Sequence, residues 1–297
     1  MSEDAIAFWT DQLKRKVLAD GGFASDPRGN YRVDATCWAI LALAGDPANH
    51  DLLRKARARL AADQLPDGRV GISLDHPEAF WPTALAILAW HQSPAHQQNQ
   101  ARAAQFLIGV SGTHPQKPKD SPVGHDTAIQ GWSWTAGTRS WVEPTALAML
   151  ALSLTGYGNH ARVEEGVRLL LDRQLPRGGW NYGNPEVFGR ELRPMPLDTG
   201  MALNALENRT PPETIRLSLD YLQSRVTSLR TPRSLGWSLL GLAAWQARPV
   251  QALTWIAECL RAQERYGLYD TPSLALLLVA WNSPGGLTAI WANPAKS

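Results

Sequence analysis

The sequence predicts an all-α protein built from about six helical hairpins, and three observations support this prediction. Short apolar segments rich in Ala and Leu recur along the chain. A segment with charged residues on one face precedes each of them, and a turn containing Gly or Pro separates the two. A helix that is apolar all round must be buried, whereas an amphipathic helix buries one face. Each pair therefore predicts an outer helix followed by an inner one.

The turn between the two helices has a recurring sequence of its own. Its clearest copy closes the segment 166–180, where Gln174, Gly178 and Trp180 follow an amphipathic run. Pro and Gly at this point indicate the end of a helix. Less complete copies occur at residues 263–269, 64–70 and 20–23. The repeated pattern predicts one array of similar units, and we expect a single domain over residues 1–297.

The elements can be assigned in chain order from these patterns. We expect outer helices over residues 4–18, 51–63, 97–108, 162–173, 212–226 and 250–263. The inner helices are expected to begin near Asp34, Thr83, Thr145, Asp198, Ser234 and Thr271. The pattern is interrupted by a long loop over residues 109–140, and loops of that length in a compact domain are usually functional lids or disordered inserts. Its tryptophans, Trp132 and Trp134, favour an ordered loop.

Composition and charge exclude several classes of protein. The 29 basic and 27 acidic residues give a net charge of +2, which predicts no nucleic-acid partner. Cys37 and Cys259 lie inside apolar helical segments, as expected for free thiols in a reducing compartment. The sequence has no signal-peptide pattern and no apolar stretch long enough to span a membrane. We therefore expect a cytoplasmic protein without a transmembrane segment, while peripheral membrane contact and the oligomeric state stay open.

The hairpin and its turn resemble the repeat of squalene-hopene cyclases and protein prenyltransferase β subunits. The copy from Gln174 to Trp180 matches that repeat fully, and the likeness extends over about residues 4–282. This resemblance implies an α/α toroid, in which inner helices ring a centre and outer helices surround them. It also implies a structural role for Gln174 and Trp180, because a side-chain amide can satisfy the unpaired groups of a helix end.

The catalytic motifs of those families are absent in their usual form. Class II terpene cyclases protonate an alkene with the middle acid of an Asp-x-Asp-Asp motif, but the corresponding position here is Leu197 and only Asp198 remains. The prenyltransferase zinc ligands include an Asp and a nearby Cys. Here Cys37 lies three positions after Asp34 rather than two, and no other zinc spacing is present. The sequence predicts no metal site and no cofactor.

Acidic residues nevertheless recur at the starts of the inner helices, where Asp34, Glu143, Asp198 and Asp270 lie. Such aspartates commonly cap helices by accepting backbone N–H groups. Glu143 fits this role less well, because Glu is not a preferred capping residue. A toroid would instead bring these acids around one apolar cavity, where burial and like charges raise a carboxyl pKa and create a general acid. Asp34, Glu143 and Asp198 are the candidate catalytic acids.

Further candidates lie in the long loop and among the 13 tryptophans. His125, beside Asp126, is a candidate acid-base residue, although adjacent residues rarely face each other. Indole rings hold apolar or cationic guests, including isoprenoids and their carbocations. The candidate ligand-binding rings cluster at inner-helix starts or in the loop expected to cover them: Trp38, Trp81, Trp132, Trp134, Trp141 and Trp237.

Three functions remain open from the sequence. The first is an isoprenoid-handling enzyme, such as a cyclase or isomerase that uses Glu143 or Asp198 as the acid. The second is a non-catalytic toroid that binds a lipid or a protein. The third is a carbohydrate-active enzyme with paired carboxylates in a Trp-rich cleft. A dry Trp-lined cavity favours the first, a centre filled by its own side chains the second, and an open groove between carboxylates the third.

Overall fold

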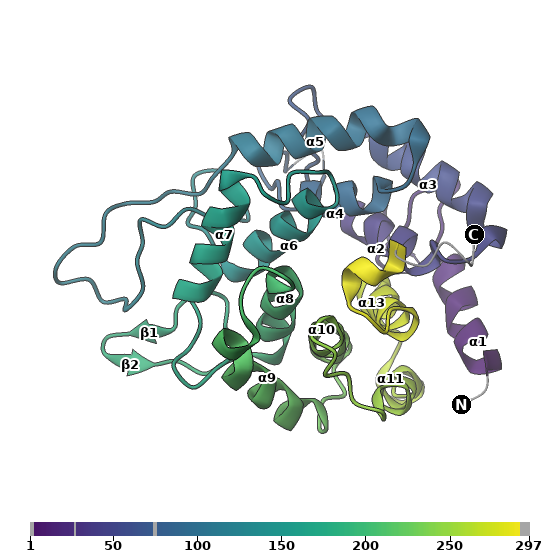
Figure 1. Ribbon diagram of the computed structural model, residues 1–297. Helices are drawn as coiled ribbons and strands as arrows, with labels where there is room; N and C mark the ends of the chain where they lie inside the picture. The colour runs from purple at the N-terminus through teal and green to yellow at the C-terminus, as the bar shows by residue number, and fades with distance from the viewer. Residues whose placement is uncertain (1–2, 27, 74–75, 292–297) are drawn as a thin grey trace.

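The inner helices form a closed ring. The computed structural model describes residues 3–26, 28–73 and 76–291, and within them six inner helices surround the centre of the molecule (Figure 1). Each inner helix contacts the next, and the last contacts the first, so the ring has no open edge. They are α2 (Val33–Leu43), α4 (Pro82–Trp90), α6 (Val142–Ser153), α8 (Pro196–Leu206), α10 (Pro232–Ala244) and α13 (Thr271–Asn282).

An outer helix precedes each inner one and packs on the outside of the ring (Figure 1). The outer helices are α1 (Glu3–Lys14), α3 (His50–Ala62), α5 (Gln97–Gly109), α7 (Ala161–Asp172), α9 (Pro212–Val226) and α11 (Ala252–Arg261). The described residues also contain four short helical segments: η1 (Pro47–Asn49), η2 (Pro94–His96), α12 (Gln263–Tyr266) and η3 (Leu287–Trp291). The predicted all-α toroid of about six hairpins is confirmed.

The different amino-acid composition of the two layers explains their positions. All residues of α4 are buried, and they are Ala, Leu and similar apolar residues with the addition of Pro82 and Thr83. On α7, by contrast, Val163 and Leu170 are buried while Arg168 is exposed. Helices that are apolar all round thus line the centre, and amphipathic ones separate them from water.

The recurring turn ties neighbouring outer helices together. The Gln174 amide donates to the carbonyl oxygen of Thr214 at 3.1 Å and to the Ser218 hydroxyl at 2.8 Å, both on α9. The Trp180 indole N–H donates to the Leu170 carbonyl oxygen at 2.6 Å, in the last turn of α7, where carbonyl groups lack partners within the helix. The amide thus links the end of α7 to the next outer helix.

A threonine in the first turn of the inner helices holds the same turn from the other side. Its hydroxyl accepts a hydrogen bond from the backbone N–H of the residue at the aromatic position of the preceding turn. The pairs are Thr36 with Phe23 at 2.9 Å, Thr83 with Val70 at 3.0 Å, Thr145 with Trp132 at 3.0 Å and Thr199 with Trp180 at 2.9 Å. In each of these hairpins, one threonine hydroxyl therefore links the turn to the inner helix.

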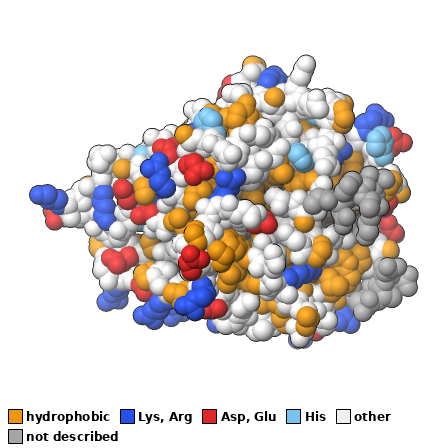
Figure 2. Space-filling model, viewed as in Figure 1, with side chains coloured by type: hydrophobic (Ala, Val, Ile, Leu, Met, Phe, Trp, Pro, Cys, Tyr) orange, Lys and Arg blue, Asp and Glu red, His pale blue; other side chains and the backbone are white. Residues whose placement is uncertain are grey.

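The long loop is ordered and protrudes from the ring together with a hairpin. The hairpin consists of β1 (Glu186–Val187) and β2 (Arg190–Glu191), and the loop pairs with it through Val123 and Val187. Both project at the left of Figure 1, and Figure 2 shows many charged side chains on that side of the molecule. The loop returns to the ring where Trp141 N–H donates to the Trp132 carbonyl oxygen at 3.0 Å.

Several expected helix boundaries differ from the structure by a few residues, and two of them have a local reason. The first outer helix ends at Lys14 rather than at residue 18, because Val17 forms a β-bridge with Phe23. The last outer helix begins at Ala252 rather than at residue 250, after a turn in which Ala252 N–H bonds to the Pro249 carbonyl oxygen. Among the described residues, no helix is both long and apolar enough to cross a bilayer.

Candidate functional site

A cavity lies at the N-terminal ends of the inner helices, and every one of these helices contributes to its wall. Its volume is about 50 Å³. Each helix supplies two residues four positions apart, which therefore lie on the same helical face. The pairs are Asp34 and Trp38, Trp81 and Leu85, Glu143 and Leu147, Leu197 and Met201, Arg233 and Trp237, and Pro272 and Leu276. Trp81 is the residue that immediately precedes α4.

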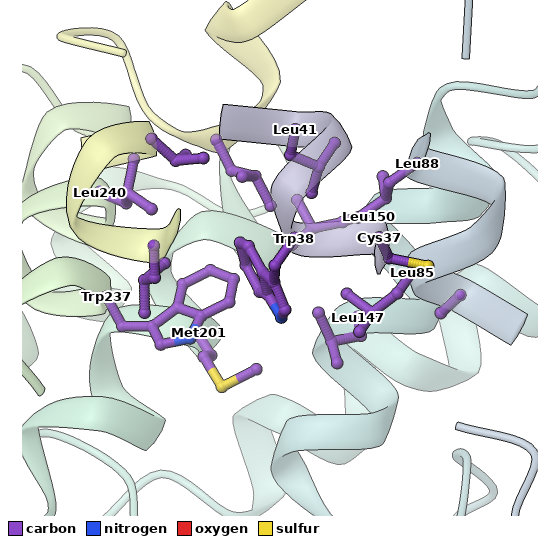
Figure 3. Packing of buried hydrophobic residues seen from close by; sticks show 14 of the residues in the cluster. Cys37, Trp38, Leu41, Leu85, Leu88, Leu147, Leu150, Met201, Trp237 and Leu240 are labelled. Carbon is purple, nitrogen blue, oxygen red and sulfur yellow. The ribbon is translucent and has the colours of Figure 1, made fainter. Parts of the chain in front are cut away.

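The two layers of this wall differ in chemistry. The first layer, nearer the helix starts, carries the charged groups of Asp34, Glu143 and Arg233. The second layer is apolar. Its Trp38 and Trp237 rings pack edge to face with centroids 5.6 Å apart, and they lie beside Met201 and Leu147 (Figure 3). We call the first layer, with its charged groups, the mouth of the cavity, and the second layer, with its two indole rings, the floor of the cavity.

Glu143 has no hydrogen-bond partner among the described residues, and it lines the cavity from the first turn of α6. Burial raises the pKa of its carboxyl to about 8, and the nearby charge of Asp198 adds to this effect, while Arg233 opposes it. At neutral pH this side chain is therefore mainly a neutral carboxylic acid. A neutral acid beside aromatic rings is equipped to give a proton to a bound molecule.

Asp198 lies next to Glu143 but behind the cavity wall. Its side chain is buried, and burial raises its pKa to about 6. On α8 the cavity-lining position belongs to Leu197. The carboxyl group on the wall thus comes from α6 rather than from α8.

Asp34 and Arg233 are both in ion pairs at the mouth. Asp34 accepts two hydrogen bonds from the Arg32 guanidinium, at 2.9 and 3.0 Å. Arg233 lies 3.6 Å from an oxygen of Asp270, and about half of its side chain is exposed, at 53%. Asp34 is buried, and this bidentate partner occupies its carboxyl group. Arg233 keeps donors available to an incoming anionic group.

The sequence predicts that Asp34, Asp198 and Asp270 cap inner helices, and only one of them does so. Asp270 is the N-cap of α13 and accepts from the Ser273 N–H at 2.9 Å, so that prediction is confirmed. The N-cap residue of α2 is Arg32 and that of α8 is Met195. The prediction that Asp34 and Asp198 cap these helices is therefore wrong, since both lie inside the first turn.

The candidate tryptophans fall into separate places. Trp38, Trp81 and Trp237 line the cavity, and Trp134 packs against Trp81 with ring centroids 5.6 Å apart. Trp132 is fully buried in the core, where its indole N–H donates to the Leu107 carbonyl oxygen at 2.8 Å.

Trp141 and His125 lie together in a second, smaller cavity under the long loop. The structure therefore brings His125 together with neither Glu143 nor Asp198 in one cavity. Burial, with a contribution from Arg173, lowers the pKa of His125 to about 4.

Sequence reasoning missed Arg233 and the aliphatic part of the second layer, including Met201. Alignment of the inner helices at their first turns would have identified them, because the wall repeats at a fixed position and again four residues later. The described residues contain no group of three or more His, Cys, Asp or Glu side chains placed to hold a metal ion. Cys37 is fully buried, and burial raises the pKa of its thiol well above the ordinary value, so the thiol is unreactive.

Comparisons with known proteins identify the fold. No family model and no curated protein matches the chain. A solved structure of a protein from Actinoplanes is similar with a TM-score of 0.64 at 16% identity, over 97% of this chain and 98% of that one. The type II terpene cyclase MstE from Scytonema is similar with a TM-score of 0.57 at 14% identity, over 93% of this chain and 97% of that one.

A variant of MstE in complex with its substrate, geranylgeranyl dihydroxybenzoate, gives a TM-score of 0.54 at 14% identity, over 94% of this chain and 78% of that one. At such low identities these likenesses establish the fold alone. The chain is an α/α toroid of the kind that type II terpene cyclases also adopt.

Proposed function

We propose that this protein protonates an apolar, isoprenoid-like molecule and uses Glu143 as the acid. The observation that carries the proposal is the neutral carboxyl of Glu143, with a pKa raised to about 8, on the same cavity wall as three indole rings. An alkene is a weak base, so its protonation requires a positioned acid and a wall that stabilises the cation. The inner ring combines both.

The reaction would begin when Glu143 gives its proton to one carbon of a substituted alkene. The π electrons form the new C–H bond, the O–H bond breaks, and the positive charge stays on the other alkene carbon. The faces of Trp38, Trp81 and Trp237 can stabilise that charge by cation–π attraction. Loss of a proton from a neighbouring carbon back to the Glu143 carboxylate then yields an isomerised alkene and restores the acid. A cyclised product forms when the π electrons of a second alkene in the chain first attack the cation and make a C–C bond, and the new cation then loses its proton in the same way.

The dimensions of the cavity restrict how such a molecule would bind. A dry cavity of about 150 Å³ holds one benzene molecule, and this one has about 50 Å³. We therefore propose that the reacting end of the chain enters between the tryptophans as their rings separate. The remainder would lie at the mouth, where Arg233 suits a polar or anionic end group.

A labelling experiment in D₂O tests the catalytic step without knowledge of the product. The protein is incubated with geranylgeraniol and with shorter isoprenoid alcohols, and deuterium incorporation into the recovered lipid is measured by mass spectrometry. The wild-type protein is expected to incorporate deuterium, and Glu143→Gln to reduce the rate by about 100-fold or more, as for other general acids. Incorporation should also decline above pH 8, where Glu143 loses its proton.

A matched control is Glu164→Gln, an exposed residue on the outer helix α7. Incorporation by this variant should equal that of the wild type. Equal incorporation by wild type and Glu143→Gln would reject the role of Glu143 as the acid.

A second candidate is a non-catalytic toroid that binds a lipid. The observation that favours it is the floor of the cavity, where Trp38 and Trp237 fill the centre of the ring and are 7% and 3% exposed. Binding of geranylgeraniol without deuterium incorporation, and with the same affinity in Glu143→Gln, would support this candidate. The small volume of the cavity gives no comparable support to a carbohydrate-active enzyme.

A further inference from the structure

A second cavity lies between the long loop and the first turn of α6, and the proposed function does not use it. We call it the loop cavity. Its volume is about 20 Å³, enough for one small polar group, since a water molecule needs roughly 10–15 Å³. Its lining is polar, with hydroxyl, imidazole, amide and guanidinium groups: Thr113, His114, His125, Thr127, Arg139, Ser140, Arg173 and Asn184, beside Trp141.

Two histidine nitrogens in this lining have no hydrogen-bond partner among the described residues. They are Nε2 of His114 and Nδ1 of His125, and both atoms are shielded from solvent. The whole side chain of His125 is buried, with 8% exposure. A buried polar atom without a partner is unfavourable, so such atoms usually face a bound group. The pair thus offers two unused hydrogen-bonding positions in the wall of the loop cavity.

The charged side chains around the cavity favour an anionic group. Arg173 is buried, pairs with Asp172 and donates to the Asp126 carbonyl oxygen at 3.0 Å, so its charge is already balanced. Arg139 lines the cavity and forms no ion pair with any described residue. Lys117 also lies near, where its ammonium donates to the Gly124 carbonyl oxygen at 2.8 Å.

Cationic side chains lower the pKa of both histidines, and Arg173 acts on each of them. The pKa of His125 is lowered by burial and then by Arg173, Lys117 and Arg139, against a weaker opposing effect of Asp126. Burial and Arg162 lower the pKa of His114, which Glu165 opposes. The positive charge around the cavity thus disfavours the imidazolium forms, and a bound anion would reverse this effect.

We propose that the loop cavity binds one oxyanion group, a carboxylate or a phosphate, through the imidazoles of His114 and His125 and the guanidinium of Arg139. His125 forms no other hydrogen bond, so it is free to carry its hydrogen on Nδ1. Protonation gives His114 a second donor. Binding of the anion therefore takes up protons and becomes tighter as the pH falls.

Isothermal titration calorimetry tests this site with the intact protein. The probes are sodium acetate and inorganic phosphate, each at constant ionic strength with sodium chloride as the reference, and acetate is compared at pH 6 and pH 8 because it stays ionised at both. One equivalent is expected to bind, more tightly at pH 6. The ratio of the two affinities distinguishes a carboxylate site from a phosphate site.

Variants separate binding at this site from adventitious binding. His125→Asn and Arg139→Ala should each weaken binding by about tenfold or more, as for the loss of a charge-assisted hydrogen bond. The matched controls His50→Asn and Arg54→Ala, on exposed positions of α3, should bind as the wild type does. Because Arg139 is exposed, its replacement tests the proposal even if His125→Asn fails to fold. Absence of saturable binding, or equal affinity in all variants, would mean that water fills the cavity and would overturn the proposal.

Discussion

Glu143 owes its raised pKa to its position in the toroid rather than to any hydrogen bond. A carboxyl group in the first turn of a helix is usually stabilised as an anion by the N–H groups of that turn. Here burial and the charge of Asp198 outweigh that stabilisation. Two carboxyl groups on neighbouring inner helices repel each other when both are ionised, so Glu143 keeps its proton near neutral pH.

This raised pKa predicts a pH-dependent stability. The folded protein keeps the Glu143 proton up to about pH 8, whereas the unfolded chain loses it near pH 4.5. The stabilisation is therefore fully present below pH 4.5 and is lost as the pH rises toward 8. One such group changes the free energy of unfolding by at most about 1.4 kcal/mol per pH unit. Urea unfolding between pH 7 and pH 8 measures this slope where Asp198 is already largely ionised.

In the same pH range Glu143→Gln should be less pH-dependent than the wild type. Glu164→Gln, on the surface of α7, should keep the wild-type slope. Parallel curves for the wild type and Glu143→Gln would show that the carboxyl is ionised in the folded protein.

The residues that hold the hairpins were harder to predict from the sequence than the hairpins themselves. The periodic Ala and Leu residues indicate an inner helix, because burial depends on the pattern of a single segment. The hydroxyl of Thr145, by contrast, bonds to Trp132 across a loop, and nothing local to either residue indicates this partner. The same limit explains the capping error at Asp34, since Arg32 as a competing partner is visible only in the folded turn.

At the scale of elements, α8 and α10 approach each other more closely than side chains would allow. Gly200 and Gly241 make this possible. A Cβ atom at Gly200 would lie 2.2 Å from the carbonyl oxygen of Trp237, and one at Gly241 would lie 2.6 Å from that of Gly200. The two helices thus meet backbone to backbone. Trp237 takes part in this contact, so the position of its ring in the cavity floor depends on the close packing of α8 and α10.

We expect Gly200→Ala to destabilise the protein by about 1–3 kcal/mol, as overpacking of a core does. The atoms in the way are backbone atoms of α10, which cannot move without shifting the helix. Urea unfolding measures the change, and Gly45→Ala is the control because nothing lies within 4 Å of an added Cβ there. Equal destabilisation of the two variants would contradict a tight contact between α8 and α10.

The order of elements along the chain was predictable, and the closeness of this contact was not. Each helix is encoded by its own periodicity, so the expected starts at Asp198 and Ser234 lie within the observed α8 and α10. The distance between two helices depends on which faces meet. The sequence indicates glycines in both, but not that Gly200 and Gly241 lie opposite each other.

At the scale of the whole molecule, polar contacts between the first and last hairpins close the ring. The ammonium group of Lys16, which is 5% exposed, donates to the carbonyl oxygen of Tyr269 at 2.6 Å. The N–H of Thr271 donates to the carbonyl oxygen of Ser25 at 2.8 Å. These bonds join the residues on either side of the first recurring turn to the last recurring turn and to the start of the last inner helix.

Replacement of Lys16 by Met should weaken this closure. The substitution keeps most of the side-chain volume but leaves the Tyr269 carbonyl without its partner, so we expect a loss of about 1.5–3 kcal/mol. Hydrogen exchange should become faster first in α1 and α13, on the two sides of the closure. Lys14→Met, at a less buried position, is the control. If hydrogen exchange became faster to the same extent in all helices, the bond between Lys16 and Tyr269 would have no special role in closing the ring.

A ring closed in this way has no intrinsic first repeat. The contact between α13 and α2 is of the same kind as the contacts between hairpins that follow each other in sequence. Geometry requires each hairpin to have two neighbours, and a peptide bond between any particular pair is not needed for that. A circular permutant that joins the ends of the chain and opens the turn after Val226 should therefore rebuild the same toroid, with the same acid facing the same tryptophans.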